Sequence, residues 1–145
     1  LYPPKGYRSL GPTRARIALG TDYADKANDE ILTIAMVETK EALDNVAEIA
    51  SVQGLSMIFV GTSDLRLSLL ATGTPQDEID ASVEGALDTI LEACKTNNIL
   101  AGLFTMQPTQ AKAMIARGFQ FVTVKTDTML LSEYAQQMIA ETRET

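Results

Sequence analysis

The chain has 145 residues, of which 46% are hydrophobic and 21% charged, a composition typical of one globular domain and not of a disordered chain. Twelve Lys and Arg stand against nineteen Asp and Glu, a net charge of −7, which argues against a nucleic acid partner because phosphate binding needs clustered cations. The sequence contains no His and one Cys. The lack of His excludes a Ser-His-Asp triad and a His-ligated metal within these residues, and a single Cys excludes a multi-Cys zinc site and a disulfide framework. The groups left for acid–base catalysis and metal binding are therefore carboxylates, Lys, Tyr and Cys94.

The sequence carries no targeting or membrane signal that we recognise. No apolar run approaches the roughly 20 residues of a membrane span, and the first residues, Leu1-Tyr2-Pro3-Pro4, do not form a charged segment followed by an apolar one. We therefore expect a cytoplasmic protein with no membrane partner. The start without Met, in a Pro-Pro segment, suggests part of a longer protein.

In chain order, a turn-rich stretch over 1–12 precedes two short predicted helices, 13–19 and 22–30. The pattern then alternates between apolar strands and amphipathic helices. Strands are predicted at 31–37, 57–60, 99–104 and 119–124; helices are predicted at 39–50, 65–70, 74–97, 108–117 and 129–141. Thr74 caps the long helix and Pro75 takes its first position, while Cys94 falls on its apolar stripe and is expected in the core.

Strand followed by helix, four times over, predicts an α/β fold with parallel strands and right-handed crossovers. Four such units make half of a (β/α)8 TIM barrel or, alternatively, a small open doubly wound sheet. We find no internal boundary and expect residues 1–145 to belong to a single domain. A half barrel alone has two open edges and an uncovered inner face, so we expect another half or a partner to supply the missing strands.

Two acidic residues stand out at the predicted carboxyl ends of the strands, where parallel barrels place their active sites. Glu38 ends the first strand, and Asp64 follows the second strand in the segment Gly61-Thr62-Ser63-Asp64. Neighbouring strands lie about 4.8 Å apart, so both carboxylates can converge on one point. Two carboxylates without His or thiolate suit Mg²⁺ best, with Mn²⁺ or Co²⁺ as substitutes. Alternatively, each acid simply stabilises the start of the helix that follows it.

Four segments resemble the HpcH/HpaI aldolase/citrate lyase family, and in particular its metal-dependent pyruvate aldolases. They are Tyr2-Pro3-Pro4-x-Gly6-x-Arg8, Val37-Glu38-Thr39, Phe59-Val60-Gly61-x-x-Asp64-Leu65 and Thr126-Asp127-Thr128-x-Leu130-Leu131. The resemblance covers essentially the whole chain in the right order. It corresponds to the C-terminal half of the family's barrel.

The resemblance implies a metal-dependent aldolase that cleaves or forms a C–C bond of a 2-oxo-4-hydroxy acid. The products would be pyruvate and an aldehyde, through a metal-stabilised pyruvate enolate. Glu38 and Asp64 become the metal ligands, and the backbone of Gly61, Thr62 and Ser63 would meet the carboxylate of a pyruvate- or oxaloacetate-type acid. Arg8 would line the site or, equally, form a structural salt bridge. The family also implies a homo-oligomer that exchanges its last helices between subunits.

The chain departs from the family in two positions and lacks a base. Met36 stands where the family often has Gln, and Lys125 where it often has Gly. The family's His base and pyruvate-binding Arg belong to the N-terminal half, so no residue of this chain is a convincing catalytic base. Two alternatives stay open. Lys125 could form a Schiff base with a carbonyl substrate if burial lowered its pKa, or the chain is a non-catalytic half barrel that only folds and associates.

Overall fold

The computed structural model describes residues 1–11 and 13–143, and the chain divides into two compact units, Leu1–Thr33 and Ile34–Thr145. Each unit has a hydrophobic core of its own. The assignment of both units to one domain remains a prediction. The strands all belong to the second unit.

The first unit contains two short helices, α1 (Thr13–Leu19) and α2 (Tyr23–Glu30), close to the predicted bounds. Its small core consists of Tyr2, Tyr23 and Ala27, with the two tyrosine rings edge to face at 6.2 Å. The side chain of Asn28 holds the first residues to α2, because it accepts from the Tyr2 backbone N–H at 2.6 Å and donates to the Tyr2 carbonyl at 3.0 Å.

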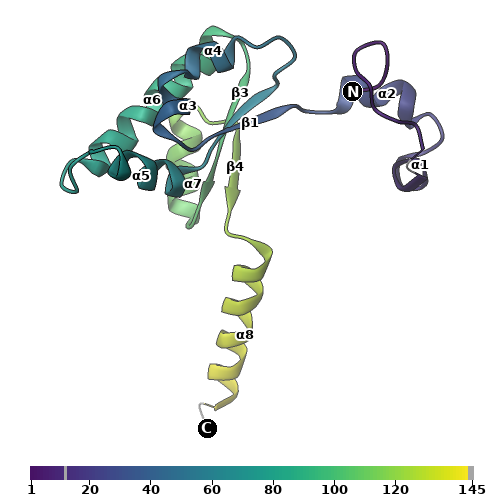
Figure 1. Ribbon diagram of the computed structural model, residues 1–145. Helices are drawn as coiled ribbons and strands as arrows, with labels where there is room; N and C mark the ends of the chain where they lie inside the picture. The colour runs from purple at the N-terminus through teal and green to yellow at the C-terminus, as the bar shows by residue number, and fades with distance from the viewer. Residues whose placement is uncertain (12, 144–145) are drawn as a thin grey trace. The chain divides into compact units, whose positions relative to one another are not determined.

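The second unit is built on a parallel sheet of β1 (Ile34–Val37), β2 (Met57–Val60), β3 (Leu100–Thr105) and β4 (Phe121–Val124). Its strands lie side by side in chain order, β1-β2-β3-β4 (Figure 1). A doubly wound sheet reverses its strand order at a switch point, whereas sequential order is the arrangement of a barrel. The sheet is therefore half of a (β/α)8 barrel, as predicted.

Helices cover one face of this sheet (Figure 1). They are α3 (Lys40–Asp44), α4 (Val46–Ala50), α5 (Thr62–Ala71), α6 (Ile79–Thr96) and α7 (Pro108–Arg117). Alternate strand residues, among them Val37, Val60 and Leu103, are fully buried against the helices. Cys94 is buried in the same core, as its place on the apolar stripe predicted.

The opposite sheet face is apolar and partly exposed, as a half barrel requires. Ile34, Met36, Leu100 and Phe121 are 46%, 55%, 38% and 42% exposed, and the rings of Phe59 and Phe121 meet edge to face at 6.1 Å. Gly102 lies between them in register; a Cβ there would lie 2.9 Å from the Phe121 carbonyl oxygen. The last helix, α8 (Asp127–Arg143), has no buried residue among those described.

Three helix predictions were wrong in detail. The helix expected over 65–70 begins earlier and is α5 (Thr62–Ala71). The helix expected over 39–50 is divided at Asn45, which has φ −101° and ψ 12° and separates α3 from α4. The long helix begins at Ile79 and not at Pro75, because residues 75–78 form a turn in which the Glu78 N–H donates to the Pro75 carbonyl. Thr followed by Pro is typical of a helix start, but here this pair precedes a turn, and the helix begins one turn later.

Candidate metal and substrate site

The predicted site lies where β1 and β2 end together. Val37 and Val60 are partners in the parallel register, and the Gly61 N–H continues the ladder by donating to the Val37 carbonyl at 3.1 Å. Glu38 and Gly61, the next residue on each strand, are therefore side by side at the carboxyl edge of the sheet.

Glu38 lies directly against Gly61. A Cβ built on Gly61 would stand 2.8 Å from the Glu38 Cβ, 3.0 Å from Glu38 Oε2 and 3.5 Å from the Met36 Sδ. The Gly61 φ of −84° suits any residue, so contact and not backbone conformation requires glycine here. The half-buried Glu38 carboxylate thus rests on the Gly61 backbone, with the Met36 thioether beside the same glycine.

Asp64 lies in the first turn of α5, the helix that follows the neighbouring strand β2. Gly61 is the N-cap of α5 and Asp64 is its third helical residue, the position from which an acidic side chain can reach back to the N-cap. Asp64 is exposed in the first turn of α5. Both carboxylates therefore flank the beginning of α5.

Within residues 1–11 and 13–143, neither the Glu38 nor the Asp64 carboxylate has a hydrogen bond or ion pair. Other acids of the same unit, such as Asp44, Glu84 and Asp88, are ion-paired. The described residues contain no cluster of three or more metal-ligating side chains. Two carboxylates nevertheless fit Mg²⁺, which usually takes one or two and fills its octahedron with water and substrate oxygens.

The start of α5 also offers donors for an anion. The N–H groups of Thr62, Ser63 and Asp64 have no carbonyl partner within the helix, the N-cap Gly61 has no side chain to cap them, and none of them donates to another side chain within the described part of the chain. Thr62 and Ser63 also line a cavity of about 390 Å³ between α5, α6, β3 and α7, whose apolar side comes from residues such as Leu87, Leu103 and Met114; neither Glu38 nor Asp64 is among its lining residues. Backbone N–H groups at a helix start are suited to carboxylate binding, as the resemblance implied for this loop.

The structure places Arg8 in the first unit, held by two tyrosines. Its Nη1 donates to the Tyr23 hydroxyl at 3.0 Å, and its guanidinium lies 5.1 and 5.6 Å from the centres of the Tyr2 and Tyr23 rings. Among the described contacts of Arg8 we see cation–π and hydroxyl interactions and no carboxylate. Its role at the site stays a prediction.

Lys125 is held by an ion pair. Its Nζ contacts the Glu133 carboxylate on α8, so the amine that a Schiff base would need is engaged by another side chain. Lys125 also has a φ of 57°, in the left-handed region that favours glycine. That conformation gives a physical reason for the family's preference for Gly at this position.

Comparison with known proteins supports the assignment drawn from these residues. The family model described as HpcH/HpaI aldolase/citrate lyase matches residues 1–133. The chain belongs to this family.

Two curated relatives show the same family over nearly the whole chain. A hydroxypyruvate/pyruvate aldolase of Rhizorhabdus wittichii is 37% identical over 98% of this chain and 56% of the relative. A 4-hydroxy-2-oxo-heptane-1,7-dioate aldolase of Shigella sonnei is 36% identical over 96% of this chain and 53% of the relative. The chain thus spans about half the length of the curated relatives it matches.

Solved structures of the family share the fold. An HpcH/HpaI aldolase/citrate lyase family protein from Burkholderia cenocepacia superposes with a TM-score of 0.77 at 30% identity, over 97% of this chain and 55% of that one. A citrate lyase β subunit from M. tuberculosis, complexed with oxaloacetate and magnesium, gives 0.53 at 23% identity over 67% of this chain and 48% of that one. The second likeness speaks for the fold alone.

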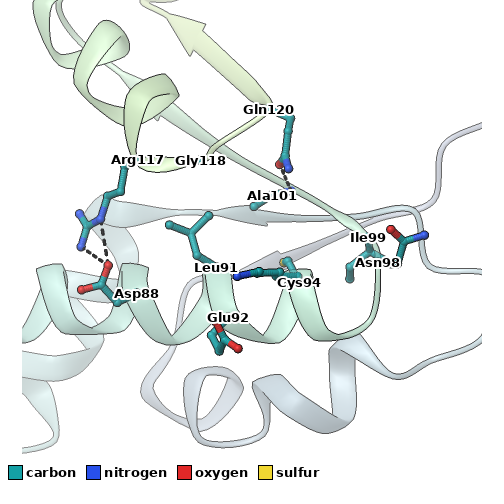
Figure 2. Close-up of a pocket in the computed structure, with 11 residues that line it drawn as sticks. Asp88, Leu91, Glu92, Cys94, Asn98, Ile99, Ala101, Arg117, Gly118 and Gln120 are labelled. Atoms are coloured by element: carbon teal, nitrogen blue, oxygen red, sulfur yellow. Dashed lines mark hydrogen bonds and ion pairs between the residues drawn. The ribbon is translucent and has the colours of Figure 1, made fainter.

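In this HpcH/HpaI chain, a second cavity lies at the opposite edge of the sheet. It measures about 490 Å³ and is lined by residues of α6 and of the segments before β3 and β4. Arg117 binds Asp88 there, and Gln120 accepts from the Ala101 N–H at 3.0 Å (Figure 2). Burial alone would lower the pKa of Arg117, but its bonds to Asp88 and Glu84 outweigh this and raise it. These polar groups are hydrogen-bonded to one another, which indicates that they stabilise the fold at this cavity.

One contact near the site was not predicted from the sequence. The Lys40 backbone N–H, two residues after Glu38, donates to Ser68 Oγ on α5 at 2.9 Å. A serine within a helix belongs to no motif; its only sequence signal is its place four residues after Asp64. Over the described part of this family member, no helix has the length and apolar character to cross a membrane.

Proposed function

We propose that this chain is the metal-binding half of a divalent-metal-dependent aldolase. The substrate would be a 2-oxo-4-hydroxy acid, cleaved to or formed from pyruvate and an aldehyde. The proposal is carried by two carboxylates that follow adjacent strands: Glu38, which lies against Gly61, and Asp64, in the first turn of the helix that Gly61 begins. Neither has a partner within the described residues. The aldolase names of the two relatives support the reaction class.

Glu38 and Asp64 would hold the divalent ion, Mg²⁺ in the first place and Mn²⁺ or Co²⁺ as substitutes. When bound, the ion supplies Lewis-acid stabilisation of the negative charge that develops on the 2-oxo oxygen as the C3–C4 bond breaks. The magnesium and oxaloacetate in the M. tuberculosis citrate lyase β subunit support a hard cation and a 2-oxo acid in this family.

The chain's own residues would bind and orient the pyruvate end of the substrate. The N–H groups of Thr62 and Ser63 point out of the start of α5 and would receive the substrate carboxylate. The Met36 side chain, beside Gly61, would present an apolar surface to the reacting carbons. Holding the carboxylate and the 2-oxo oxygen in this way fixes which bond of the substrate is broken.

Proton transfer from the 4-hydroxyl is not assigned to any residue of this chain. The sequence has no His, and Lys125 is held by Glu133. We therefore expect the 145-residue chain to bind metal and 2-oxo acid without appreciable turnover. The pyruvate released from a 2-oxo-4-hydroxy acid in the presence of Mg²⁺, measured with the chain alone, checks this expectation.

Mn²⁺ binding tests the proposed function most directly, followed by the loss of the free-ion electron paramagnetic resonance signal. Glu38→Gln and Asp64→Asn keep the shape of each side chain and remove its charge, so each should abolish saturable binding. Glu41→Gln on α3 is the matched control, because this exposed acid lies three residues from Glu38 and its loss should leave binding unchanged. Equal binding by the native chain and the two ligand variants would refute the site.

Association between chains and a cytoplasmic location complete the proposal. Exposed apolar side chains on the bare sheet face and on α8, where Leu130, Leu131 and Tyr134 are more than half exposed, favour a homo-oligomer. Light scattering after size-exclusion chromatography measures its mass. A monomer at micromolar concentration would leave the oligomer unsupported while leaving the metal site untouched.

A further inference from the structure

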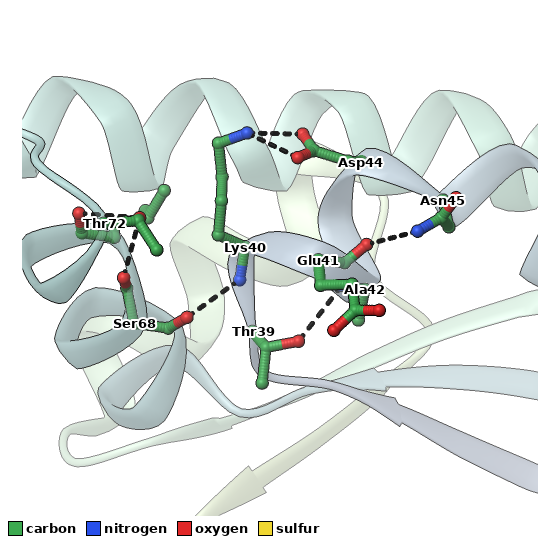
Figure 3. A network of polar contacts seen from close by, with 9 residues as sticks. Thr39, Lys40, Glu41, Ala42, Asp44, Asn45, Ser68 and Thr72 are labelled. Atoms are coloured by element: carbon green, nitrogen blue, oxygen red, sulfur yellow. Dashed lines mark hydrogen bonds and ion pairs between the residues drawn. The ribbon is translucent and has the colours of Figure 1, made fainter.

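The first helix after β1 is capped from another helix. Thr39 Oγ1 accepts from the Ala42 N–H of its own helix at 3.0 Å. The Lys40 N–H, at the first position of α3, has no carbonyl partner within the helix and donates instead to Ser68 Oγ at 2.9 Å (Figure 3). The start of α3 is thereby fastened to the middle of α5.

Ser68 is well placed to act as a fixed point. It stands four residues after Asp64, so both side chains lie on neighbouring positions of one helix face. Leu65 and Leu69, which flank this region of α5, are 0% and 4% exposed in the core, and they hold the helix against the sheet. Through its bond to the Lys40 N–H, Ser68 thus links the start of α3 to the helix that carries Asp64.

Glu38 is bracketed by two bonds to the β2–α5 segment. The residue before it, Val37, accepts from the Gly61 N–H at 3.1 Å, and Lys40, two residues after it, donates to Ser68. The carboxylate between them rests on Gly61. The backbone on both sides of Glu38 is therefore tied to the segment that bears Asp64.

We propose that Ser68 is a positioning residue for the metal pair: its hydroxyl, bound to the Lys40 N–H, sets the place of Glu38 relative to Asp64. This inference rests on the proposed function. Without the hydroxyl, a partly buried N–H loses its partner and the Glu38 backbone is tied on one side only. Loss of such outer partners typically weakens metal binding 10- to 100-fold.

Three variants of α5 test the inference through Mn²⁺ affinity. Ser68→Ala should weaken binding about tenfold, and Ser68→Thr, which keeps a hydroxyl on the same carbon, should restore it. The matched control is Thr72→Val, because the Thr72 hydroxyl donates only to the Ser68 and Leu69 carbonyls of its own helix. This control removes a hydroxyl at the C-cap of α5 without touching Lys40, and it should bind Mn²⁺ as the native chain does.

A second pair of variants removes the bond from the other side. Lys40→Pro deletes the donor N–H at a first helical position, where proline is well tolerated, and Thr39 has the extended backbone (φ −130°, ψ 156°) that a following proline needs. It should weaken Mn²⁺ binding as Ser68→Ala does. Lys40→Ala keeps the N–H while removing the ammonium that pairs with Asp44, and it should bind normally.

Mn²⁺ affinity together with amide hydrogen exchange at residues 38–40 separates the positioning role of Ser68 from the proposed metal site. If Ser68→Ala binds Mn²⁺ as tightly as the native chain while Glu38→Gln does not bind, the positioning role is overturned and the metal site stands. An equal loss in Thr72→Val also overturns it, since the effect then belongs to α5 as a whole. If the native chain binds no Mn²⁺, the proposed function fails and the positioning role fails with it. Amide exchange then tests the Ser68–Lys40 bond by itself: unchanged exchange in Ser68→Ala refutes a stabilising effect of this bond, and faster exchange supports one.

Discussion

Two groups of polar side chains, at opposite edges of the parallel sheet, differ in whether they have hydrogen-bond or ion-pair partners. At the amino edge, Arg117 binds Asp88 and Glu84, and Gln120 binds the Ala101 backbone. At the carboxyl edge, Glu38 lies against Gly61 and Asp64 stands in the first turn of the helix that Gly61 begins, and neither has a partner among residues 1–11 and 13–143. Satisfied charges hold elements together, whereas unsatisfied ones beside free helix N–H groups leave room for a ligand. The carboxyl edge also has an ion pair, between Lys125 and Glu133, so the difference concerns the Glu38 and Asp64 pair and favours a ligand-binding role for that pair.

The largest expected effect concerns Cys94, which lines the cavity at the amino edge yet is only 2% exposed. A thiol reagent should modify it at least about a hundredfold more slowly in the folded chain than in urea, because reaction requires local opening. Colour release from a disulfide reagent measures both rates. Rapid labelling of the native chain would mean that the amino edge is open and reactive, and it would break the comparison.

The same thiol gives the comparison a pH dependence. Burial raises the pKa of Cys94 in the folded chain, so the folded state keeps its proton where the unfolded thiol, with a pKa of about 8.5, loses it. This contribution to stability is complete below that pH and is lost as the pH rises through the folded pKa. Cys94→Ser should therefore reduce the loss of stability above about pH 8.5, as followed by urea unfolding at several pH values.

Gly61→Ala should weaken Mn²⁺ binding about tenfold or more. The new Cβ would stand 2.8 Å from the Glu38 Cβ, so the carboxylate must leave its place on the N-cap. A binding titration checks this result. Unchanged affinity would show that Glu38 moves freely and that the close contact has no bearing on the carboxyl edge.

Arg117→Ala should cost about 1 kcal/mol of unfolding free energy, since its carboxylate partners are largely exposed to solvent. Mn²⁺ affinity should not change, because the substitution lies at the amino edge. Asp80→Ala, which breaks the more exposed pair with Arg66, is the control for stability and should cost less. Altered metal affinity in Arg117→Ala would show that the two edges are coupled.

Gly85→Ala gives the smallest effect and serves as the counterpart of Gly61→Ala. Gly85 lies within α6, and a Cβ there meets no atom within 4 Å. The substitution should raise the free energy of unfolding by about 0.5–1 kcal/mol through helix propensity, with metal binding unchanged. Destabilisation in thermal unfolding would contradict the open space that the structure shows around Gly85.

The sequence predicted the four parallel strands well because they are short, apolar and bounded by turn residues, but this pattern left a half barrel and a doubly wound sheet open, and the strand order decides between them. Bounds failed where local signals were misleading: Thr74-Pro75 is typical of a helix start but precedes a turn, and Asn45 interrupts an apolar period that otherwise continues. Glu38 and Asp64 were singled out by their places after two strands, and the structure confirms those places, whereas their role as metal ligands stays a prediction. Ser68 was not singled out, because its importance lies in a contact 28 residues away in the chain, which no local pattern encodes. Arg8 was singled out by resemblance, and the structure shows its tyrosine partners without testing its role.

The partly exposed apolar face of the sheet, opposite the helices, limits the methods by which the folding of this chain can be followed. Environment-sensitive dyes such as anilinonaphthalene sulfonate fluoresce on exposed apolar surface, which is usually a mark of loosened states. Here Met36 and Phe121 present such surface in the folded chain itself. A dye-based melting curve would therefore start from a high signal, and circular dichroism of the helices is the measurement that separates native from unfolded protein.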